Sequence, residues 1–112
     1  MKRGEIWTVS GGNDYAGKPR PAVIVQDDGY KALASITICP LTTDIAAVPL
    51  TRPEIAPSES NGLRMPSLLM VDKVTTLPKS KLGHRIGELA DGDMVRLNRA
   101  MMVFLGLAAR AG

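Results

Sequence analysis

The sequence predicts a mostly-β, barrel-like domain (all-β or α+β) with one covering helix near its end. Short β-branched or apolar runs, separated by Gly, Pro, Asn and Asp, recur up to about residue 90. Only the segment after them repeats apolar residues at the helical spacing of three and four. A chain of 112 residues suits one compact core, so a single domain spanning residues 1–112 is expected.

The strands are expected to follow one another along the chain with polar breaks between them. Pro40 should end the third strand, because proline cannot donate to a central ladder. Residues 52–66 contain three prolines and a glycine among polar residues, which predicts a long surface loop. The expected strands are residues 5–10, 22–26, 33–40, 47–50 (a short edge strand), 67–71 and 84–89, with an extended stretch at 75–78 and one helical turn at 79–82.

The helix is expected from about Asp93 to Ala109, with Asp91 or Gly92 capping its start. It is apolar beyond one face, which indicates packing in a core or a dimer; it lacks the Lys/Arg-rich face of a membrane-surface helix. The expected apolar face consists of Met94, Leu97, Met101, Phe104, Leu105 and Ala108.

The composition indicates which cellular compartment and which class of binding partner to expect. The net charge of +3 and pI of about 9.3 favour a polyanion or an acidic peptide as partner. Cys39 is the only cysteine, so no intrachain disulfide forms, and it is expected to be a small buried hydrophobe in a reducing compartment. No signal-peptide core or membrane-length apolar run is present, which predicts a cytoplasmic protein with no membrane contact.

Several classes of chemistry are disfavoured by the residues present. One histidine and one cysteine do not make a zinc cluster, and a ribonuclease built on two histidines is not possible. The chain has no glycine-rich phosphate loop opening a helix and no Gly-x-Ser-x-Gly motif. Neither a metal nor another cofactor is expected, and His84 is interpreted as a residue at the surface or at a strand end.

What remains is a polar rim where strands begin and end. Arg20 lies between two prolines at the entrance of one strand, and Thr42 follows the end of another. If these strands are neighbours, the planar guanidinium and the hydroxyl can converge on one phosphate. The alternative is a solvated loop arginine and an ordinary turn threonine. The same loops carry Asp14, Tyr15, Lys18, Thr43 and Asp44.

Five blocks, in this order, resemble the MazF/PemK toxins. Together they extend over nearly the whole chain, and the second is the most specific of them. The blocks are RGEIW at 3–7, GKPRPAVIV at 17–25, CPLTT at 39–43, SLLMVDKV at 67–74 and LGHRIGEL at 82–89.

The resemblance implies the plasmid-maintenance-toxin barrel, an SH3-like bent antiparallel sheet with a C-terminal helix, working as a homodimer. It also implies a sequence-specific endoribonuclease (an mRNA interferase) that cuts single-stranded RNA. The ribose 2′-hydroxyl attacks the adjacent phosphorus and leaves a 2′,3′-cyclic phosphate and a 5′-hydroxyl. No metal is required, because the nucleophile belongs to the substrate.

By position, Arg20 matches the family's catalytic arginine and Thr42 its catalytic threonine. Their expected role is to stabilise charge on the non-bridging phosphate oxygens. Asp14, Asp44 or Asp72 is expected to take the proton, since arginine stays protonated. Tyr15 and Trp7 are candidates for stacking a base, with a core position as the alternative for Trp7. Expected RNA-binding residues are Asp14, Tyr15, Lys18, Thr43, Asp44, Asp72, Lys73 and Thr75.

The chain departs from its relatives in one segment. Several relatives carry Arg or Lys where this chain has Thr75, and an acidic residue where it has Pro78. Either the site is weaker, or Lys73 or Lys79 replaces the missing cation.

The implied partner is an antitoxin whose acidic, disordered tail lies across the RNA groove. Two rival functions use the same fold: a CcdB-like gyrase poison without chemistry, and a catalytically decayed binding module. The C-terminus lacks the aromatic-glycine-aliphatic tail associated with gyrase poisoning.

Overall fold

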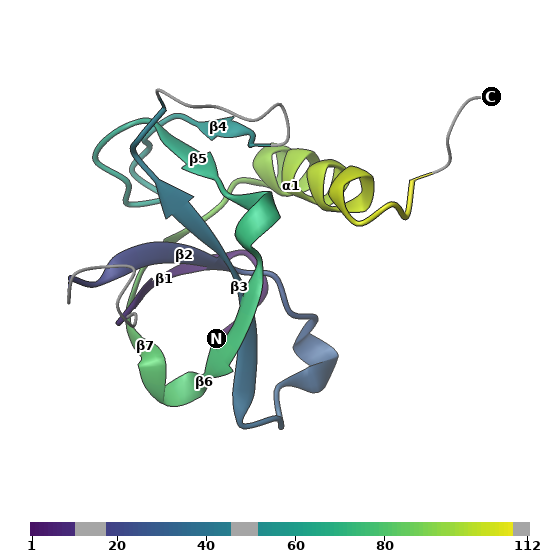
Figure 1. Cartoon of the computed structure of the whole chain (residues 1–112). Helices are drawn as coiled ribbons and strands as arrows, with labels where there is room; N and C mark the ends of the chain where they lie inside the picture. Colours follow the sequence, from purple (N-terminus) through teal and green to yellow (C-terminus); the bar gives the residue numbers. More distant parts are fainter. Residues whose placement is uncertain (11–17, 46–51, 109–112) are drawn as a thin grey trace.

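A computed structural model describes residues 1–10, 18–45 and 52–108. Within these ranges the chain forms a curled antiparallel sheet with one helix beside it (Figure 1), which confirms the mostly-β class. The strands are β1 (Glu5–Val9), β2 (Arg20–Ile24), β3 (Ser35–Thr42), β4 (Glu54–Ile55), β5 (Ser67–Leu69), β6 (Thr75–Pro78) and β7 (Leu82–Glu88). The helix is α1 (Asp91–Phe104), and short 3-10 turns are η2 (Asp28–Tyr30), η3 (Val71–Lys73) and η4 (Lys79–Lys81).

The strands are ordered β4-β5-β3-β2-β1-β7, and β6 pairs with β3 away from this path. β3 is therefore the centre of the fold. Its first part pairs with β2 on one side and β6 on the other, and its last two residues pair with β5. The curled sheet makes a half-barrel, and α1 lies beside β4 and β5 (Figure 1).

The two faces of the sheet bury two different cores. Successive strand residues point to opposite faces, so Val23 and Cys39 contribute to the core that also contains Leu97 of the helix. Their neighbours Ile24 and Ile38 belong to a second core inside the half-barrel. Every one of these five side chains is at most 1% exposed. The continuous apolar runs of β2 and β3 are explained by burial on both faces.

The expectation that Pro40 ends the third strand was wrong. β3 continues through Pro40 to Thr42, and Pro40 stands opposite Ala22 in the ladder. Its missing N–H is harmless because β3 changes partner here: the Pro40 carbonyl accepts from the backbone N–H of Met70, 2.8 Å away. The proline therefore lies at a junction between ladders, where the sequence pattern alone does not reveal a second partner.

Residues 52–66 are more ordered than a surface loop. They contain β4, and Ile55 is completely buried. Asn61 is 3% exposed, and its side-chain amide donates to the carbonyl of Ala56 while its Oδ1 accepts from the N–H groups of Ser58 and Leu63. A buried amide that satisfies three backbone groups lets this segment pack against β7.

Other strand boundaries shift by one or two residues. The second strand begins at Arg20 rather than at residue 22, and the strand expected at 67–71 ends at Leu69 because η3 begins at Val71. The final strand starts at Leu82. The extended stretch at 75–78 is confirmed as β6, and the turn after it is η4. The edge strand expected at 47–50 lies outside the described residues.

The helix is shorter and less buried than expected. It begins after Ala90, without a side-chain cap, and ends at Phe104, before Gly106 adopts a positive φ of 72°. Leu97 is buried, whereas Phe104 is 46% exposed and Leu105 is 60% exposed, so the described chain itself covers only part of the expected apolar face. The apolar periodicity continues past the point where the helix leaves the sheet.

One further feature agrees with the sequence. Cys39 is a free, fully buried thiol, and burial, helped by the nearby Asp72 charge, raises its pKa to about 12. Such a thiol is chemically inert. Among the described residues, no helix is long and apolar enough to cross a membrane.

Candidate functional site

Arg20 opens β2 and stands opposite Val9 of β1. Pro19 and Pro21 restrict the flanking backbone to extended conformations, which explains why a strand begins here. The Arg20 side chain is exposed, and its guanidinium forms no hydrogen bond or ion pair with any described residue. Among the described residues, the guanidinium therefore holds no part of the fold together and is available to bind an anionic ligand.

Thr42 is the last residue of β3, half-buried and opposite Leu68 of β5. Its hydroxyl oxygen accepts a hydrogen bond from the backbone N–H of Asp44, 3.1 Å away. This turn fixes the position of the hydroxyl oxygen. Since the hydroxyl accepts in that bond, its own proton stays available for another acceptor.

The strands that carry Arg20 and Thr42 are neighbours. Ala22 pairs with Pro40, and two residues further along each strand the same register brings Arg20 and Thr42 to corresponding positions. Both residues lie an even number of positions from the paired residues, so strand alternation assigns them to one face. The β2–β3 ladder ends just before them, where β3 turns to β5. The condition for convergence on one phosphate is thus met by the topology.

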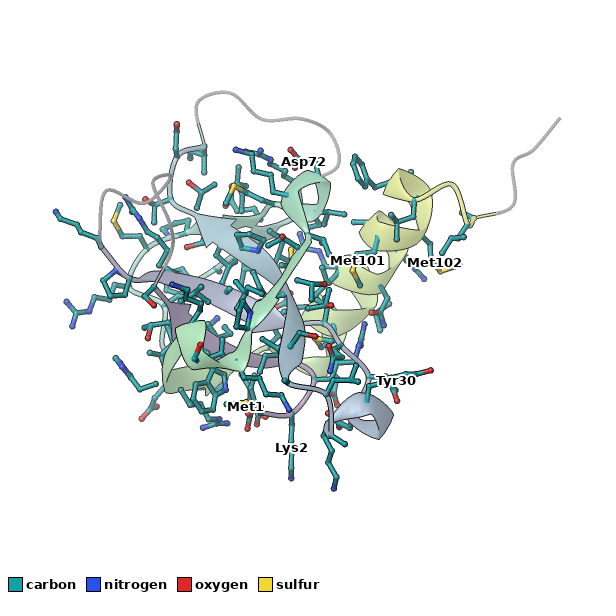
Figure 2. The ribbon with its side chains drawn as sticks, turned by 60° about the horizontal axis from the view of Figure 1, so that its bottom comes forward. Met1, Lys2, Tyr30, Asp72, Met101 and Met102 are labelled. Carbon is teal, nitrogen blue, oxygen red and sulfur yellow. The ribbon has the colours of Figure 1, made fainter. Side chains whose placement is uncertain are left out.

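Asp72 is not a free carboxylate. In η3 it accepts two hydrogen bonds from Arg52, at 2.8 Å (Nε to Oδ1) and 2.9 Å (Nη2 to Oδ2). Figure 2 shows Asp72 on its turn near the helix. The hydrogen bonds from Arg52 hold the pKa of this carboxyl below its usual range. This pairing makes Asp72 a poor proton acceptor. The sequence did not predict Arg52 as its partner, because the two residues are twenty positions apart and no local pattern connects them.

The other expected residues are distributed around Arg20 and Thr42 and along β6. Thr75 stands opposite Ile38, four residues before the end of β3. Lys79 cannot replace the cation missing at Thr75, because its ammonium donates to the carbonyl of Lys31 beyond the other end of β3. Exposed residues are Lys18, Thr43, Asp44, Lys73 and Thr75. Asp14 and Tyr15 lie outside the described residues.

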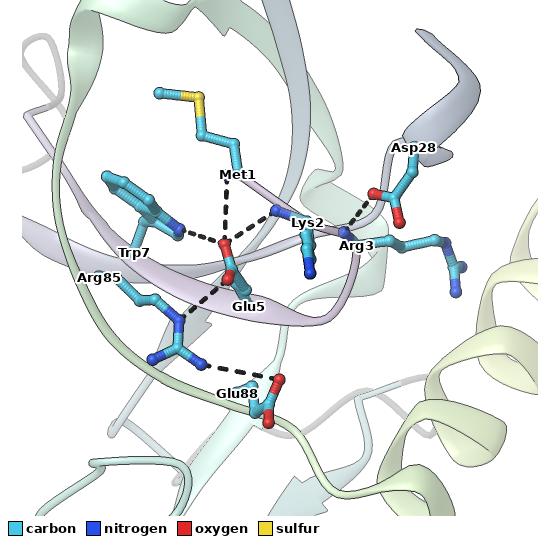
Figure 3. A network of polar contacts seen from close by, with 8 residues as sticks. All are labelled: Met1, Lys2, Arg3, Glu5, Trp7, Asp28, Arg85 and Glu88. Atoms are coloured by element: carbon cyan, nitrogen blue, oxygen red, sulfur yellow. Dashed lines mark hydrogen bonds and ion pairs between the residues drawn. The ribbon is translucent and has the colours of Figure 1, made fainter. Parts of the chain in front are cut away.

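Glu5 is the centre of a polar network that the sequence did not reveal (Figure 3). Its Oε1 accepts from the backbone N–H of Lys2 and the indole N–H of Trp7, and Oε2 accepts from Arg85. The N-terminal ammonium lies 3.4 Å from Oε1. Burial alone raises the pKa of Glu5, but these hydrogen bonds and the ammonium outweigh it and lower the pKa to about 2. The network joins the chain start to β7.

This network also decides between the two roles considered for Trp7. Its indole ring packs against the inner core, and its N–H is used by Glu5. Trp7 is therefore a structural residue. His84 is exposed on β7, in agreement with a surface position. In the described part of the chain, no three His, Cys, Asp or Glu residues gather as metal ligands.

A hollow of about 560 Å³ lies at the opposite end of β2, beside η2. Lys2, Lys31 and Lys79 line it together with Asp27 and Asp28. Of the described residues considered for the RNA site, only Lys79, the suggested replacement cation, contributes to it. Both carboxylates are engaged locally, Asp27 with the N–H of Gly29 and Asp28 with the N–H of Arg3.

Comparison with known proteins gives one consistent family. The sequence profile of the PemK-like, MazF-like toxins of type II toxin–antitoxin systems matches residues 2–105. A probable endoribonuclease MazF of Mycolicibacterium smegmatis is 52% identical over 108 residues, covering 96% of this chain and 99% of the relative.

Solved structures support the same assignment. An endoribonuclease in complex with its cognate antitoxin, from a mycobacterial species, superposes with a TM-score of 0.81 at 25% identity, covering 98% of this chain and 99% of that one. The Mycobacterium tuberculosis toxin MazF-mt6 superposes with a TM-score of 0.79 at 26% identity, covering 94% and 99%. The chain therefore belongs to the PemK-like, MazF-like toxins of type II toxin–antitoxin systems.

Proposed function

We propose that this toxin is a sequence-specific, metal-independent endoribonuclease that cuts single-stranded RNA, with Arg20 and Thr42 at the scissile phosphate. The observation that carries the proposal is the strand register, which supports convergence of an unpaired guanidinium and an available hydroxyl at one end of neighbouring strands. The names of the relatives point to the same reaction.

In the proposed reaction, the ribose 2′-oxygen bonds to the adjacent phosphorus while the bond from phosphorus to the 5′-oxygen breaks. The proton of the 2′-hydroxyl passes to a base, and the departing 5′-oxygen receives a proton. Charge develops on the non-bridging oxygens as phosphorus becomes pentacoordinate. Arg20 donates two N–H groups to these oxygens, Thr42 donates its O–H, and such fixed donors lower the barrier.

The base is a carboxylate rather than Arg20, whose guanidinium stays protonated. Asp72 is disfavoured because its ion pair with Arg52 lowers its pKa. Asp44, two residues after Thr42, and Asp14 remain the candidates. Asp44→Asn and Asp14→Asn variants separate them, because only the true base makes the rising limb of the pH–rate profile disappear.

Substrate and inhibitor are proposed to share one groove on a single domain, residues 1–112, acting in the cytoplasm. The positively charged rim at Lys18 and Arg20 suits the RNA backbone, and Tyr15 suits an unpaired base. The net charge of +3 also suits the acidic tail of a cognate antitoxin, and one similar solved structure is a complex of that kind.

A homodimer is proposed as the working form. The second half of α1 and the residues after it present apolar side chains that no described residue covers. Their exposed fractions are 46% for Met102, 61% for Val103, 46% for Phe104, 60% for Leu105 and 69% for Leu107. A second copy of the chain is the proposed cover of this surface.

The end chemistry of the products tests the reaction. Purified protein is incubated with a long single-stranded RNA in excess EDTA, the cuts are mapped, and one mapped RNA is remade with a 2′-deoxy residue at the cut. The proposal predicts 2′,3′-cyclic phosphate and 5′-hydroxyl ends, and no cut at the 2′-deoxy position. Cleavage of the 2′-deoxy RNA, or a requirement for metal, contradicts the mechanism.

One observation favours a second candidate, a catalytically decayed binding module. The family resemblance implies a cation where this chain has Thr75. Lys79, which was considered as its replacement, donates to the carbonyl of Lys31 beyond the other end of β3. RNA that remains intact but bound to folded protein supports this candidate. RNA that remains intact and unbound favours the other alternative, a gyrase poison like the CcdB-like toxins.

A further inference from the structure

A row of paired residues crosses the sheet beside Arg20. Val9 of β1 pairs with Arg20 on one side and with Leu82 of β7 on the other. The β2–β3 register, extended by two residues past its last pair, places Thr42 of β3 beyond Arg20 in the same row. Neighbouring strands lie about 4.8 Å apart, so Leu82 is roughly 10 Å from Arg20 across the strands. The residue before Leu82 is Lys81, the last of η4.

The backbone of Lys81 is fixed next to this row. Its carbonyl accepts from the N–H of Ser10 at 2.9 Å and from the hydroxyl of Ser10 at 3.2 Å. β7 also packs closely on β1, since a Cβ on Gly83 would lie 2.3 Å from the hydroxyl oxygen of Thr8, which itself accepts from the N–H of His84. The lysine therefore projects from a rigid corner rather than from a loose turn.

Among the described residues, the charge around this corner is of one sign. Lys81 is exposed, and its ammonium has no hydrogen bond or ion pair with a described residue, as is true of Lys18 and Arg20. Segments 8–10, 18–22 and 80–84 contain no Asp or Glu. Lys31 differs, because it lines the hollow that also holds two carboxylates.

We propose that Lys81 binds an RNA phosphate next to the scissile one, so that the RNA backbone crosses β3, β2, β1 and β7 along the row from Thr42 to Leu82. This assignment rests on the proposed ribonuclease function and adds a substrate-binding residue to it. Unpaired cations spaced across a sheet are the means by which single-stranded nucleic acid is held without reading its bases.

The test is the salt dependence of RNA binding. The probe is a short RNA spanning a mapped cut, with a 2′-deoxy residue at the cut so that it stays intact. Its affinity for wild type, Lys81→Ala, Lys81→Arg and Lys31→Ala is measured by fluorescence anisotropy from low to moderate salt. Thermal melting shows whether each variant is folded; both lysines are exposed, so we expect no loss of stability.

We expect Lys81→Ala to bind severalfold more weakly at low salt, and its slope of log affinity against log salt to shrink by about 0.7, the value for one phosphate contact of a single strand. Lys81→Arg should keep the wild-type slope, and so should Lys31→Ala. Equal losses in Lys81→Ala and Lys31→Ala would indicate a general charge effect and overturn the proposal, as would a wild-type slope in Lys81→Ala. If wild type neither binds nor cuts RNA, the proposed function fails as well; if it cuts normally, only the assignment of Lys81 fails.

Discussion

Arg52 and Asp72 clamp the two ends of the β4–β5 hairpin. Arg52 precedes β4 and Asp72 follows β5, and two parallel hydrogen bonds of 2.8 and 2.9 Å join their side chains. Their side chains are 13% and 26% exposed. β5 is in turn the ladder neighbour of Thr42, so this pair supports the strand end that presents the hydroxyl.

Breaking the clamp should cost stability rather than RNA affinity. Asp72→Asn removes the charge that faces Arg52, and we expect the free energy of unfolding to fall by about 1–3 kcal/mol. Urea unfolding measures this loss, with Glu59→Gln as the exposed control. If Asp72→Asn keeps full stability and loses RNA binding, Asp72 contacts the substrate and the clamp is unimportant.

Gly62 is expected to be intolerant of any side chain. Its φ is +70°, and a Cβ there would lie 2.1 Å from the carbonyl oxygen of Ile86. Gly62→Ala should therefore lose at least about 4 kcal/mol of stability or fail to fold. Gly92 in the first turn of α1 meets nothing within 4 Å, so Gly92→Ala should be neutral or stabilising by up to about 1 kcal/mol. Comparable thermal melts for both variants contradict the described packing.

Glu5 should make the fold sensitive to acid. Its pKa falls from 4.5 to about 2 on folding, so the folded state binds fewer protons in this range. The stabilisation is present above the ordinary pKa and is lost as the pH falls from about 4.5 towards 2. Urea unfolding at several pH values should show a smaller loss in Glu5→Gln, which is already less stable at neutral pH. An identical pH dependence in wild type and variant would show that the network contributes nothing.

The exposed end of the helix predicts the behaviour of the dimer. Leu105 is 60% exposed in the single chain, so Leu105→Glu should not destabilise that fold. It should, however, place a charge in the proposed contact and shift sedimentation from dimer to monomer. Arg99→Glu is the matched control, since Arg99 is also exposed but lies off the apolar surface. An unchanged dimer in Leu105→Glu locates the contact elsewhere.

The sequence predicted the elements better than their partners. Turn residues and apolar runs located the strands and the helix because these signals are local. Three features were missed. Pro40 continues its strand because its carbonyl accepts a hydrogen bond from the backbone N–H of Met70, and β4 forms because Leu68 pairs with it. The apolar residues at the end of the helix are exposed in the described chain.

The candidate site also contains residues that the sequence predicts and contacts that it does not. Arg20 and Thr42 were selected from the sequence by their positions at strand ends and by the family resemblance, and the register between β2 and β3 adds that their positions correspond. The pairing of Asp72 with Arg52 was not foreseen, because the two residues are far apart in sequence. No sequence motif marks Lys81, and its position beside Ser10 depends on the return of the chain from β6 to β7.

The most direct test of the central claim is RNA cleavage in excess EDTA by wild type, Arg20→Ala, Thr42→Val and Arg64→Ala, each first checked for folding. Thr42→Val keeps the side-chain shape and removes the hydroxyl, and Arg64→Ala removes an exposed arginine far from the site in sequence. We expect wild-type rates from Arg64→Ala and losses of about 100-fold or more in kcat from Arg20→Ala and Thr42→Val, because each removes a donor to the developing charge. Undiminished cleavage by folded Arg20→Ala would contradict the account.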